Sequence, residues 1–231
     1  MVDNLDTDTI QRLKIEVAQA ALKYVRPDTV LGVGSGSTVN AFIDALTAAQ
    51  IPLKGAVAAS LESERRLKSA GIEVLDFNWV DSLDIYIDGA DETTDFLCLT
   101  KGGGAALTRE KILATAARQF ICMVDIRKRV NRLGAFPIPV EVIPFARSYV
   151  ARKLIGLGGQ PTWRQGVFTD NGNVILDVKG LDIVDPFALE SAIEALPGVV
   201  CCGIFAKRRA DIALISSEKG IDTLLAQPIL K

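Results

Sequence analysis

TVLGVGSGST, at residues 29–38, is the stretch of sequence that decides the fold. Its first five residues form an apolar run with β-branched side chains, which is typical of a strand buried on both faces of a sheet. Its last five residues form a loop of glycine, serine and threonine, and a helical pattern follows this loop as far as Leu46. A strand, a glycine-rich loop and a helix in this order predict one unit of a parallel α/β sheet.

The same alternation of strands and helices continues on both sides of this stretch, up to about residue 124. Further strands are predicted at residues 57–60, 72–75, 83–88, 97–100 and 120–124, and further helices at residues 10–24, 62–70 and 105–118. The repeated alternation predicts a parallel sheet that is covered by helices on both of its faces.

From about residue 135 the sequence pattern changes. Prolines cluster at residues 137–144, an Asn-Gly hairpin signal lies at residues 171–172, a helix is predicted between Asp185-Pro186 and Pro197-Gly198, and a strand follows at residues 199–205. A strand at residues 212–215 and a last helix then return to the first pattern. We therefore expect a small α+β domain inserted near the end of a larger α/β domain.

Composition excludes several classes of protein. Of the 231 residues, 49% are hydrophobic and 23% are charged, as in a folded globular chain. The net charge of −2 gives no basic excess, so we expect neither nucleic acid nor an anionic membrane as a partner. No apolar stretch is long enough to span a bilayer, and the acidic residues 1–8 do not resemble a signal peptide. The cysteines are Cys98, Cys122, Cys201 and Cys202, whose spacing fits neither a disulfide framework nor a zinc site, so we expect small buried residues of a reduced protein.

The sequence contains no histidine, the usual acid and base side chain near neutral pH. Hydrolysis by a Ser-His-Asp or Cys-His arrangement is therefore excluded. Any proton transfer must use Asp, Glu, Lys, Cys or Tyr.

Three loops at predicted strand ends are candidate ligand sites, because ligands of open α/β sheets bind beyond the carboxyl ends of the strands. The first is residues 34–38, where glycines allow a close approach and the following helix offers free N–H groups to an anion. A dinucleotide fingerprint requires glycine at position 37, which is Ser, so this loop is interpreted as a phosphate site. The alternative is that Thr38 only caps the helix and the glycines only form a tight turn.

The second loop is acidic. It reads DGADE at residues 88–92, and Asp88 stands at the end of the predicted strand. Three carboxylates within five residues repel one another unless donors lie among them. The location at a strand end favours a functional role over a solvated turn capped by Asp91.

The third loop reads KGGGAALTREK at residues 101–111. Consecutive glycines are costly in backbone entropy, and their N–H groups are suited to face a ligand oxyanion. Glu110 follows on an apolar stripe of the next helix. It either reaches water at the edge of the stripe or is buried, and burial would raise its pKa and suit it to act as a base.

These three loops, taken in this order with residues 136–142 and 169–173, resemble ribose-5-phosphate isomerase of the A type. The resemblance covers essentially the whole chain, and its most specific part is residues 101–111. It implies a Rossmann-like catalytic domain at residues 1–133 and 206–231 and a small α+β, ferredoxin-like domain at residues 134–205.

The resemblance also implies an activity. Members interconvert D-ribose 5-phosphate and D-ribulose 5-phosphate through an enediolate in the non-oxidative pentose phosphate pathway, without a metal ion or an organic cofactor. They are commonly dimers or tetramers of the cytosol or of plastids, so we expect a cytoplasmic homodimer or homotetramer.

Site residues are carried over from the resemblance by position. Glu110 is expected to be the general base, with Asp88 and Asp91 assisting ring opening and Lys101 stabilising the enediolate. The expected substrate-binding residues are Lys14, Ser35, Gly36, Ser37, Thr38, Gly89, Ala90, Gly102, Gly103, Gly104 and Lys128. No metal ligands are expected.

Two positions depart from the family pattern. Arg127 stands where the family usually has Ser, and Arg209 stands where a small residue is usual. These departures bear on phosphate affinity and on contacts between subunits.

Other classes remain as alternatives. A coenzyme A transferase has a related fold and uses a glutamate nucleophile. A sugar-phosphate-sensing module usually accompanies a basic DNA-binding helix pair, and glucosamine-phosphate deaminases typically use histidine.

Overall fold

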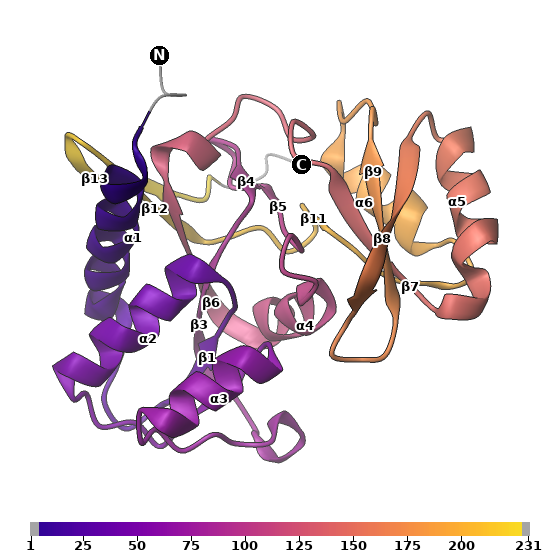
Figure 1. Cartoon of the computed structure of the whole chain (residues 1–231). Helices are drawn as coiled ribbons and strands as arrows, with labels where there is room; N and C mark the ends of the chain where they lie inside the picture. The colour runs from indigo at the N-terminus through magenta and orange to yellow at the C-terminus, as the bar shows by residue number, and fades with distance from the viewer. Residues whose placement is uncertain (1–4, 228–231) are drawn as a thin grey trace.

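The computed structural model describes residues 5–227 and contains two principal sheets joined by a short third one (Figure 1). Residues 1–4 of the acidic N-terminal segment, and the end of the predicted last helix, lie outside the described residues. The large sheet has the strand order β13-β12-β6-β3-β1-β2. Its strands are β1 (Val30–Val33), β2 (Gly55–Ala58), β3 (Leu83–Gly89), β6 (Ala117–Asp125), β12 (Ile212–Ser217) and β13 (Gly220–Leu225).

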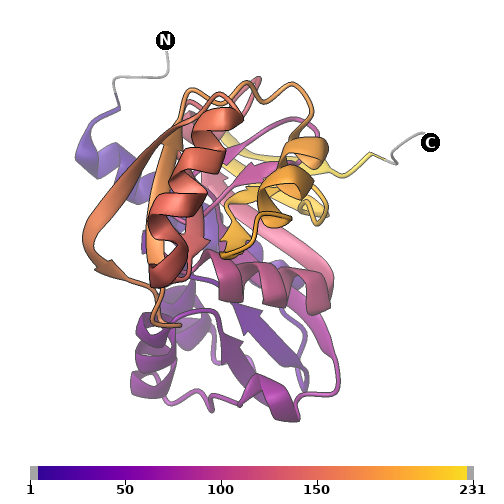
Figure 2. The ribbon, with the colours of Figure 1, turned by 90° about the vertical axis from the view of Figure 1, so that its right-hand side faces the viewer.

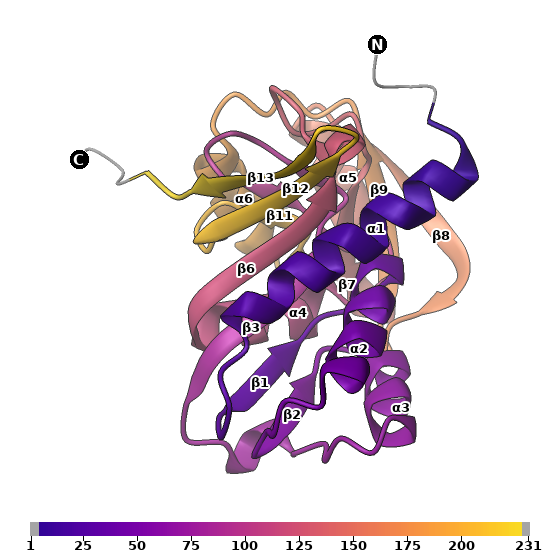
Figure 3. The same ribbon diagram turned by 90° about the vertical axis from the view of Figure 1, so that its left-hand side faces the viewer.

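Neighbouring strands of the large sheet are parallel, except that β13 pairs with β12 in the antiparallel direction. Helices α1 (Thr7–Ala21), α2 (Ser37–Ala49) and α3 (Leu61–Ser69) pack on one face, and α4 (Leu107–Ala116) packs on the other (Figure 3). Each face has its own apolar core: Ile85 and Ile87 of β3 contribute to the first, and Tyr86 to the second. This arrangement confirms the predicted α/β sheet covered on both faces.

Two predicted elements of this part are wrong. The last helix is instead strand β13, because residues 220–225 continue the sheet as an edge strand after a tight turn. The predicted strand at residues 72–75 does not form a ladder. It makes an isolated bridge between Val74 and Ala56, since Gly71 and the following 3-10 helix at Phe77–Trp79 leave only a short extended segment.

The smaller sheet lies beside the large one in Figure 1, and Figure 2 views the molecule from the side of this smaller sheet. Its strand order is β10-β7-β9-β8. Its elements are β7 (Ile138–Val142), α5 (Arg147–Gly156), β8 (Gln160–Phe168), β9 (Val174–Lys179), α6 (Pro186–Glu194) and β10 (Val199–Cys202). All of its pairs are antiparallel, and the βαββαβ sequence of elements is ferredoxin-like. Both helices pack on one face of this sheet.

Local signals of the small sheet form as predicted. The Asn-Gly pair lies in the β8–β9 hairpin, where Gly172 has a φ of +78°. Asp185 caps α6 by accepting a hydrogen bond from the N–H of Ala188, and Pro186 is the first residue of the helix. The strand predicted at residues 199–205 is divided at Gly203 into two strands.

A three-stranded sheet connects the two larger units. It consists of β4 (Glu92–Thr93), β5 (Leu99–Thr100) and β11 (Ile204–Phe205), in the order β11-β5-β4. Strand β11 directly follows the small sheet, so the chain returns to the large sheet through this connection. The domain boundaries at residues 134 and 205 stay a prediction.

Two further expectations concern single residue types and helix length. Cys122, Cys201 and Cys202 are buried free thiols, and Cys98 is half-buried. None of the helices in the described part of the chain combines the length and the apolarity that a membrane crossing requires.

Candidate active site

A cavity of about 180 Å³ lies at the carboxyl ends of β1, β3 and β6. Small-molecule pockets for drug-sized ligands measure roughly 300–1,000 Å³, so this cavity is matched to a smaller ligand. Its lining consists of Lys14, Ser35, Gly36, Ser37, Thr38, Gly89, Ala90, Asp91, Lys101, Gly102, Gly103, Gly104, Glu110, Val124, Asp125, Arg127 and Lys128. The three loops singled out in the sequence therefore meet around one cavity, with Val124, Asp125 and Arg127 as additional members.

Lys101 is the charged centre of the cavity floor. Its side chain is 3% exposed, and its Nζ lies 2.8 Å from Oδ2 of Asp88 and 3.2 Å from Oε2 of Glu110. The same ammonium donates a hydrogen bond to the carbonyl of Gly89 over 2.7 Å. Burial lowers the pKa of Lys101, but the charges of Asp88 and Glu110 outweigh it and raise the pKa above its ordinary value, so Lys101 is a cation at neutral pH.

Asp88 lies behind the cavity wall and is completely buried. Its Oδ1 accepts hydrogen bonds from the N–H groups of Ser35, over 3.0 Å, and Gly89, over 2.7 Å. Its Oδ2 accepts from the hydroxyl of Tyr86 and contacts Lys101. All of its oxygen atoms are thus engaged by protein donors, and it is the one predicted site residue that does not line the cavity.

Gly34 makes this position of Asp88 available. A Cβ atom at Gly34 would overlap the carboxyl group of Asp88, so no other residue fits there without displacing that side chain. The first glycine loop therefore packs against Asp88 and also faces the cavity.

Glu110 is the buried carboxylate of the cavity wall. It is 3% exposed, which settles the choice that the helical pattern left open. Its Oε1 accepts a hydrogen bond from the hydroxyl of Ser35 over 2.6 Å. Its Oε2 accepts no hydrogen bond from residues 5–227 and has only the 3.2 Å ion contact with Lys101.

The surroundings of Glu110 shift its protonation towards neutral pH. Burial, followed by the nearby charge of Asp88, raises the pKa of Glu110 to about 7, although Lys101 and Ser35 act in the opposite direction. A carboxylate with this pKa and one oxygen without a hydrogen-bond donor can accept a proton from a ligand near pH 7.

The glycine loop at residues 102–104 is held from the small sheet. Arg164 of β8 donates hydrogen bonds to the carbonyl groups of Gly102 and Gly103 and is paired with Asp177 of β9. On the other side, the N–H of Gly103 donates to Oδ2 of Asp91 over 2.8 Å. Sequence reasoning did not find Arg164, because no pattern marks a single cation of a distant strand as a partner of this loop.

The opposite end of the cavity gathers cations and free donors. Nζ of Lys14 lies 2.9 Å from the hydroxyl of Ser37. Helix α2 begins after Gly36 without a capping side chain from the described residues, so Thr38 is not observed as its cap. The first N–H groups of α2 therefore remain available to an anion.

Two more cations border this end. Lys128 lies in the 3-10 helix Ile126–Lys128, with its Nζ 6.0 Å from the ring centre of Phe136. Arg127 donates two hydrogen bonds, of 2.8 and 2.9 Å, to Asp125, and the carboxylate of Asp125 balances the charge of Arg127. Arg209, the other departure, does not line the cavity and donates to the carbonyl of Phe96.

Within residues 5–227, no group of three or more acidic, histidine or cysteine side chains is arranged to hold a metal ion. The polar groups of the cavity are instead a buried Asp-Lys-Glu cluster, a glycine loop and an anion-binding end.

Comparison with known proteins identifies this arrangement. The family model of ribose 5-phosphate isomerase A (phosphoriboisomerase A) matches residues 55–220. The ribose 5-phosphate isomerase A of Neisseria gonorrhoeae is 42% identical, with 95% of this chain and 98% of that chain covered and a TM-score of 0.93. The ribose 5-phosphate isomerase A of Methanocaldococcus jannaschii is 38% identical, with coverage of 93% and 99% and a TM-score of 0.87.

A third solved structure carries a ligand. It is a D-ribose-5-phosphate isomerase in complex with phospho-erythronic acid, 36% identical, with 94% of this chain and 99% of that chain covered and a TM-score of 0.89. The family match extends over most of the chain, and the identities hold over nearly its full length. The chain belongs to the ribose 5-phosphate isomerase A family.

Proposed function

We propose that this chain interconverts D-ribose 5-phosphate and D-ribulose 5-phosphate by moving a proton between C2 and C1 of the open sugar. The observation that carries the proposal is the buried Glu110 carboxylate at the cavity wall, where the surroundings raise its pKa to about 7 and its Oε2 accepts no hydrogen bond from the described residues. This is the group that a proton transfer near neutral pH requires in a chain without histidine. The reaction places the protein in the non-oxidative pentose phosphate pathway.

The phosphate binds at the cationic end of the cavity. Lys14 and Lys128 supply charge, and the N–H groups at the start of α2 supply hydrogen bonds together with Ser37 and Thr38. The complex of a relative with phospho-erythronic acid supports a phosphorylated sugar derivative as the ligand class. Binding energy at this end positions the reacting carbons some distance away.

Ring opening comes first, because the substrate cyclises in solution. Asp91 lines the cavity and is oriented by the N–H of Gly103, so it can exchange a proton with the ring oxygen or the anomeric hydroxyl. Asp88 was expected to share this task, but its oxygens are fully engaged behind the wall. We assign Asp88 the role of holding and charging Lys101.

Proton transfer follows on the open aldehyde. Oε2 of Glu110 takes the proton from C2, the electron pair moves towards the carbonyl oxygen at C1, and an enediolate forms. The proton of the C2 hydroxyl then passes to the oxygen at C1, Glu110 returns its own proton to C1, and the carbonyl forms at C2, which gives the ketose. One carboxylate serves both carbons because they are adjacent.

Lys101 and the glycine loop stabilise the enediolate. Lys101 already contacts Glu110 at 3.2 Å, and this attraction weakens when Glu110 becomes neutral on taking up the proton. The ammonium is then free to attract the negative oxygen of the substrate. The N–H groups of residues 102–104, fixed by Arg164, add donors that are oriented before the reaction begins.

The proposal is tested by assaying purified protein with ribose 5-phosphate in the presence of a chelator. We expect conversion to ribulose 5-phosphate, and a loss of at least about a hundredfold in kcat for Glu110→Gln, with little change in substrate binding. The control is Glu62→Gln, which changes an exposed glutamate of α3. Absence of conversion by the unmodified protein, or near-normal kcat for Glu110→Gln, would contradict the proposal. Incubation with an acyl-CoA and an acceptor acid tests the transferase alternative.

We also propose, from the usual behaviour of the family, a cytoplasmic homodimer or homotetramer. Light scattering of the purified protein tests the assembly, and a mass equal to that of one chain would contradict it.

A further inference from the structure

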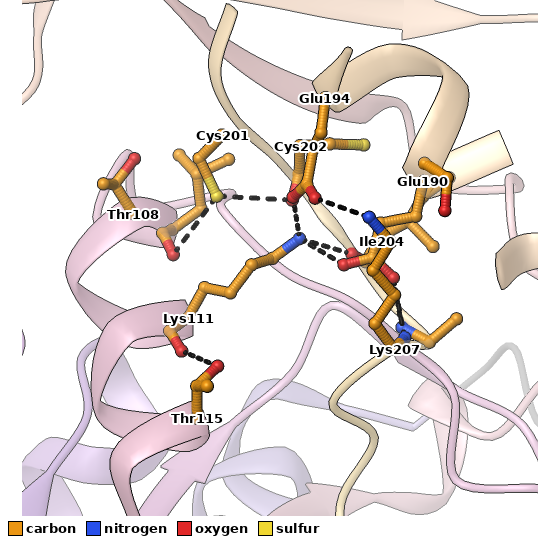
Figure 4. A network of polar contacts seen from close by, with 12 residues as sticks. Thr108, Lys111, Thr115, Glu190, Glu194, Cys201, Cys202, Ile204 and Lys207 are labelled. Atoms are coloured by element: carbon orange, nitrogen blue, oxygen red, sulfur yellow. Dashed lines mark hydrogen bonds and ion pairs between the residues drawn. The ribbon is translucent and has the colours of Figure 1, made fainter. Parts of the chain in front are cut away.

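A second buried ion cluster lies on the side of α4 that faces the small sheet (Figure 4). Lys111 immediately follows Glu110, and its side chain is only 15% exposed. Its Nζ lies 2.6 Å from Oε1 of Glu190 and 2.7 Å from Oε1 of Glu194, both on α6. It also donates a hydrogen bond to the carbonyl of Ile204 in β11 over 2.8 Å. One ammonium thus joins three elements.

Glu190 is committed to this cluster. Its side chain is 1% exposed, and its second oxygen accepts hydrogen bonds from the N–H groups of Ala206, over 2.9 Å, and Lys207, over 2.8 Å. The carboxylate therefore fixes the segment that leaves β11 as well as the side chain of Lys111.

Residues in and just before β11 also contact Lys101. The carbonyl of Gly203 accepts a hydrogen bond from the backbone N–H of Lys101 over 2.8 Å. The ring of Phe205 has its centre 4.8 Å from Nζ of Lys111 and 5.8 Å from Nζ of Lys101. Residues 203–206 therefore contact both Lys101, in the proton-transfer site, and Lys111, the neighbour of Glu110 on α4.

Helix α4 depends on polar contacts for its orientation. It starts at Leu107 without a capping side chain among residues 5–227, and one of its four buried residues is Glu110 itself. The apolar part of its buried stripe is only Leu107, Leu113 and Ala114, so polar contacts on both sides of Glu110 add to what orients the helix. Before Glu110, the hydroxyl of Thr108 donates to the buried Glu141 of β7, and after it Lys111 binds α6 and β11.

We propose that Lys111 is a positioning residue of the isomerase: by tying α4 to α6 and β11, it fixes the rotation of the helix and holds the Glu110 carboxylate against the cavity. Successive helical residues point about 100° apart, so a rotation that releases Lys111 also turns Glu110 away. The inference rests on the proposed function, because it concerns the base of that reaction.

The test compares Lys111→Met with a matched control, Lys207→Met. Lys207 binds the other oxygen of Glu194 over 3.2 Å, but its side chain is 38% exposed and it contacts no residue of α4 through that group. We expect Lys111→Met to lower kcat at least about tenfold, because a small misplacement of a catalytic group can cost a factor of about a hundred. Its KM should stay within about twofold, since the phosphate-binding end is unchanged. Lys207→Met should retain the kcat of the unmodified protein.

Both variants are assayed on protein shown to be folded by circular dichroism, because a purely structural role would lower stability without lowering kcat per folded molecule. Lys111→Arg, which keeps a cation within reach of both carboxylates, should recover part of the lost kcat. If Lys111→Met does not fold, Glu194→Gln takes its place. Glu194 is partly exposed, and removing its charge weakens the same contact with Lys111. The kcat of this variant should fall at least about twofold.

The outcomes separate this inference from the function. An inactive unmodified protein overturns the proposed function. When the unmodified protein is active, the proposed function stands and the variants decide the inference. The inference is overturned if Lys111→Met keeps its kcat, if the change appears in KM instead, or if Lys207→Met loses as much kcat. Where Glu194→Gln is used as the substitute, a kcat equal to that of the unmodified protein overturns it as well.

Discussion

Replacing Asp88 by asparagine removes one of the two charges that act most strongly on Glu110. Burial and then the charge of Asp88 raise the pKa of Glu110 to about 7, while Lys101 opposes them. The base must be deprotonated to take the C2 proton, so kcat/KM falls as the pH drops below the pKa of Glu110. Removing the negative charge of Asp88 stabilises the Glu110 carboxylate. The acid limb of the pH profile should therefore move to lower pH.

The size of this shift follows from the geometry. Oδ2 of Asp88 and Oε2 of Glu110 lie 2.8 and 3.2 Å from the same Lys101 nitrogen, so at most 6.0 Å separates them. At 6 Å and an effective dielectric constant of about 20, two unit charges interact by about 2.8 kcal/mol, which corresponds to about two pH units. The acid limb should move from about pH 7 to about pH 5. The plateau should fall, because a weaker base transfers a proton more slowly.

The assay measures kcat/KM for ribose 5-phosphate from about pH 4.5 to about pH 9, which covers both expected positions of the acid limb. The substrate phosphate also titrates near pH 6, so the comparison needs a matched variant. Glu62→Gln is that control, since it changes an exposed carboxylate that neither lines the cavity nor is among the strongest influences on Glu110. A limb for Asp88→Asn that stays with that of Glu62→Gln, or moves to higher pH, would refute the reasoning.

Two further predictions concern binding and stability. Lys128→Ala should raise KM about tenfold with a small change in kcat, because a charge-assisted contact to phosphate is worth roughly 1.5–3 kcal/mol. Steady-state kinetics test this, with Lys54→Ala as an exposed control. An unchanged KM for Lys128→Ala would argue against a phosphate contact. Gly34→Ala should lower the free energy of unfolding by about 1–3 kcal/mol, because its Cβ overlaps Asp88. Urea unfolding beside Gly156→Ala, where an added Cβ meets nothing within 4 Å, tests this, and equal stability of the two variants would contradict it.

The parts of the fold that the sequence predicts are those where a local pattern matches a buried environment. Strands β1, β3 and β6 are apolar runs because both faces of the sheet are covered, and the Asn-Gly hairpin carries its own turn chemistry. Strand β13 is different. All six of its residues are exposed or half-buried, and pairing with β12 decides their conformation, so a short mixed pattern cannot distinguish strand from helix.

The site divides in the same way. Strand ends and glycine loops place the cavity, because parallel strands bring their carboxyl ends to one edge. The burial of Asp88 was not foreseen, since it depends on Tyr86, Lys101 and Ser35 meeting it in space. One signal was available: Tyr86 and Asp88 are two residues apart on one strand, so they point to the same face. No local signal connects Lys111 to α6.

The cluster explains how a chain without histidine can transfer a proton near neutral pH. Asp88 and Glu110 contribute two negative charges around the one positive charge of Lys101, and all three side chains are nearly inaccessible to water. A buried group with a net charge of −1 is unfavourable, so a proton is shared with it close to pH 7. In the proposed reaction, Glu110 takes the C2 proton and the negative charge passes to the substrate oxygen, which the same ammonium attracts. The net charge of the site does not change during the step. The cavity then has to accommodate a short displacement of charge rather than a new charge, and its fixed donors need little reorganisation.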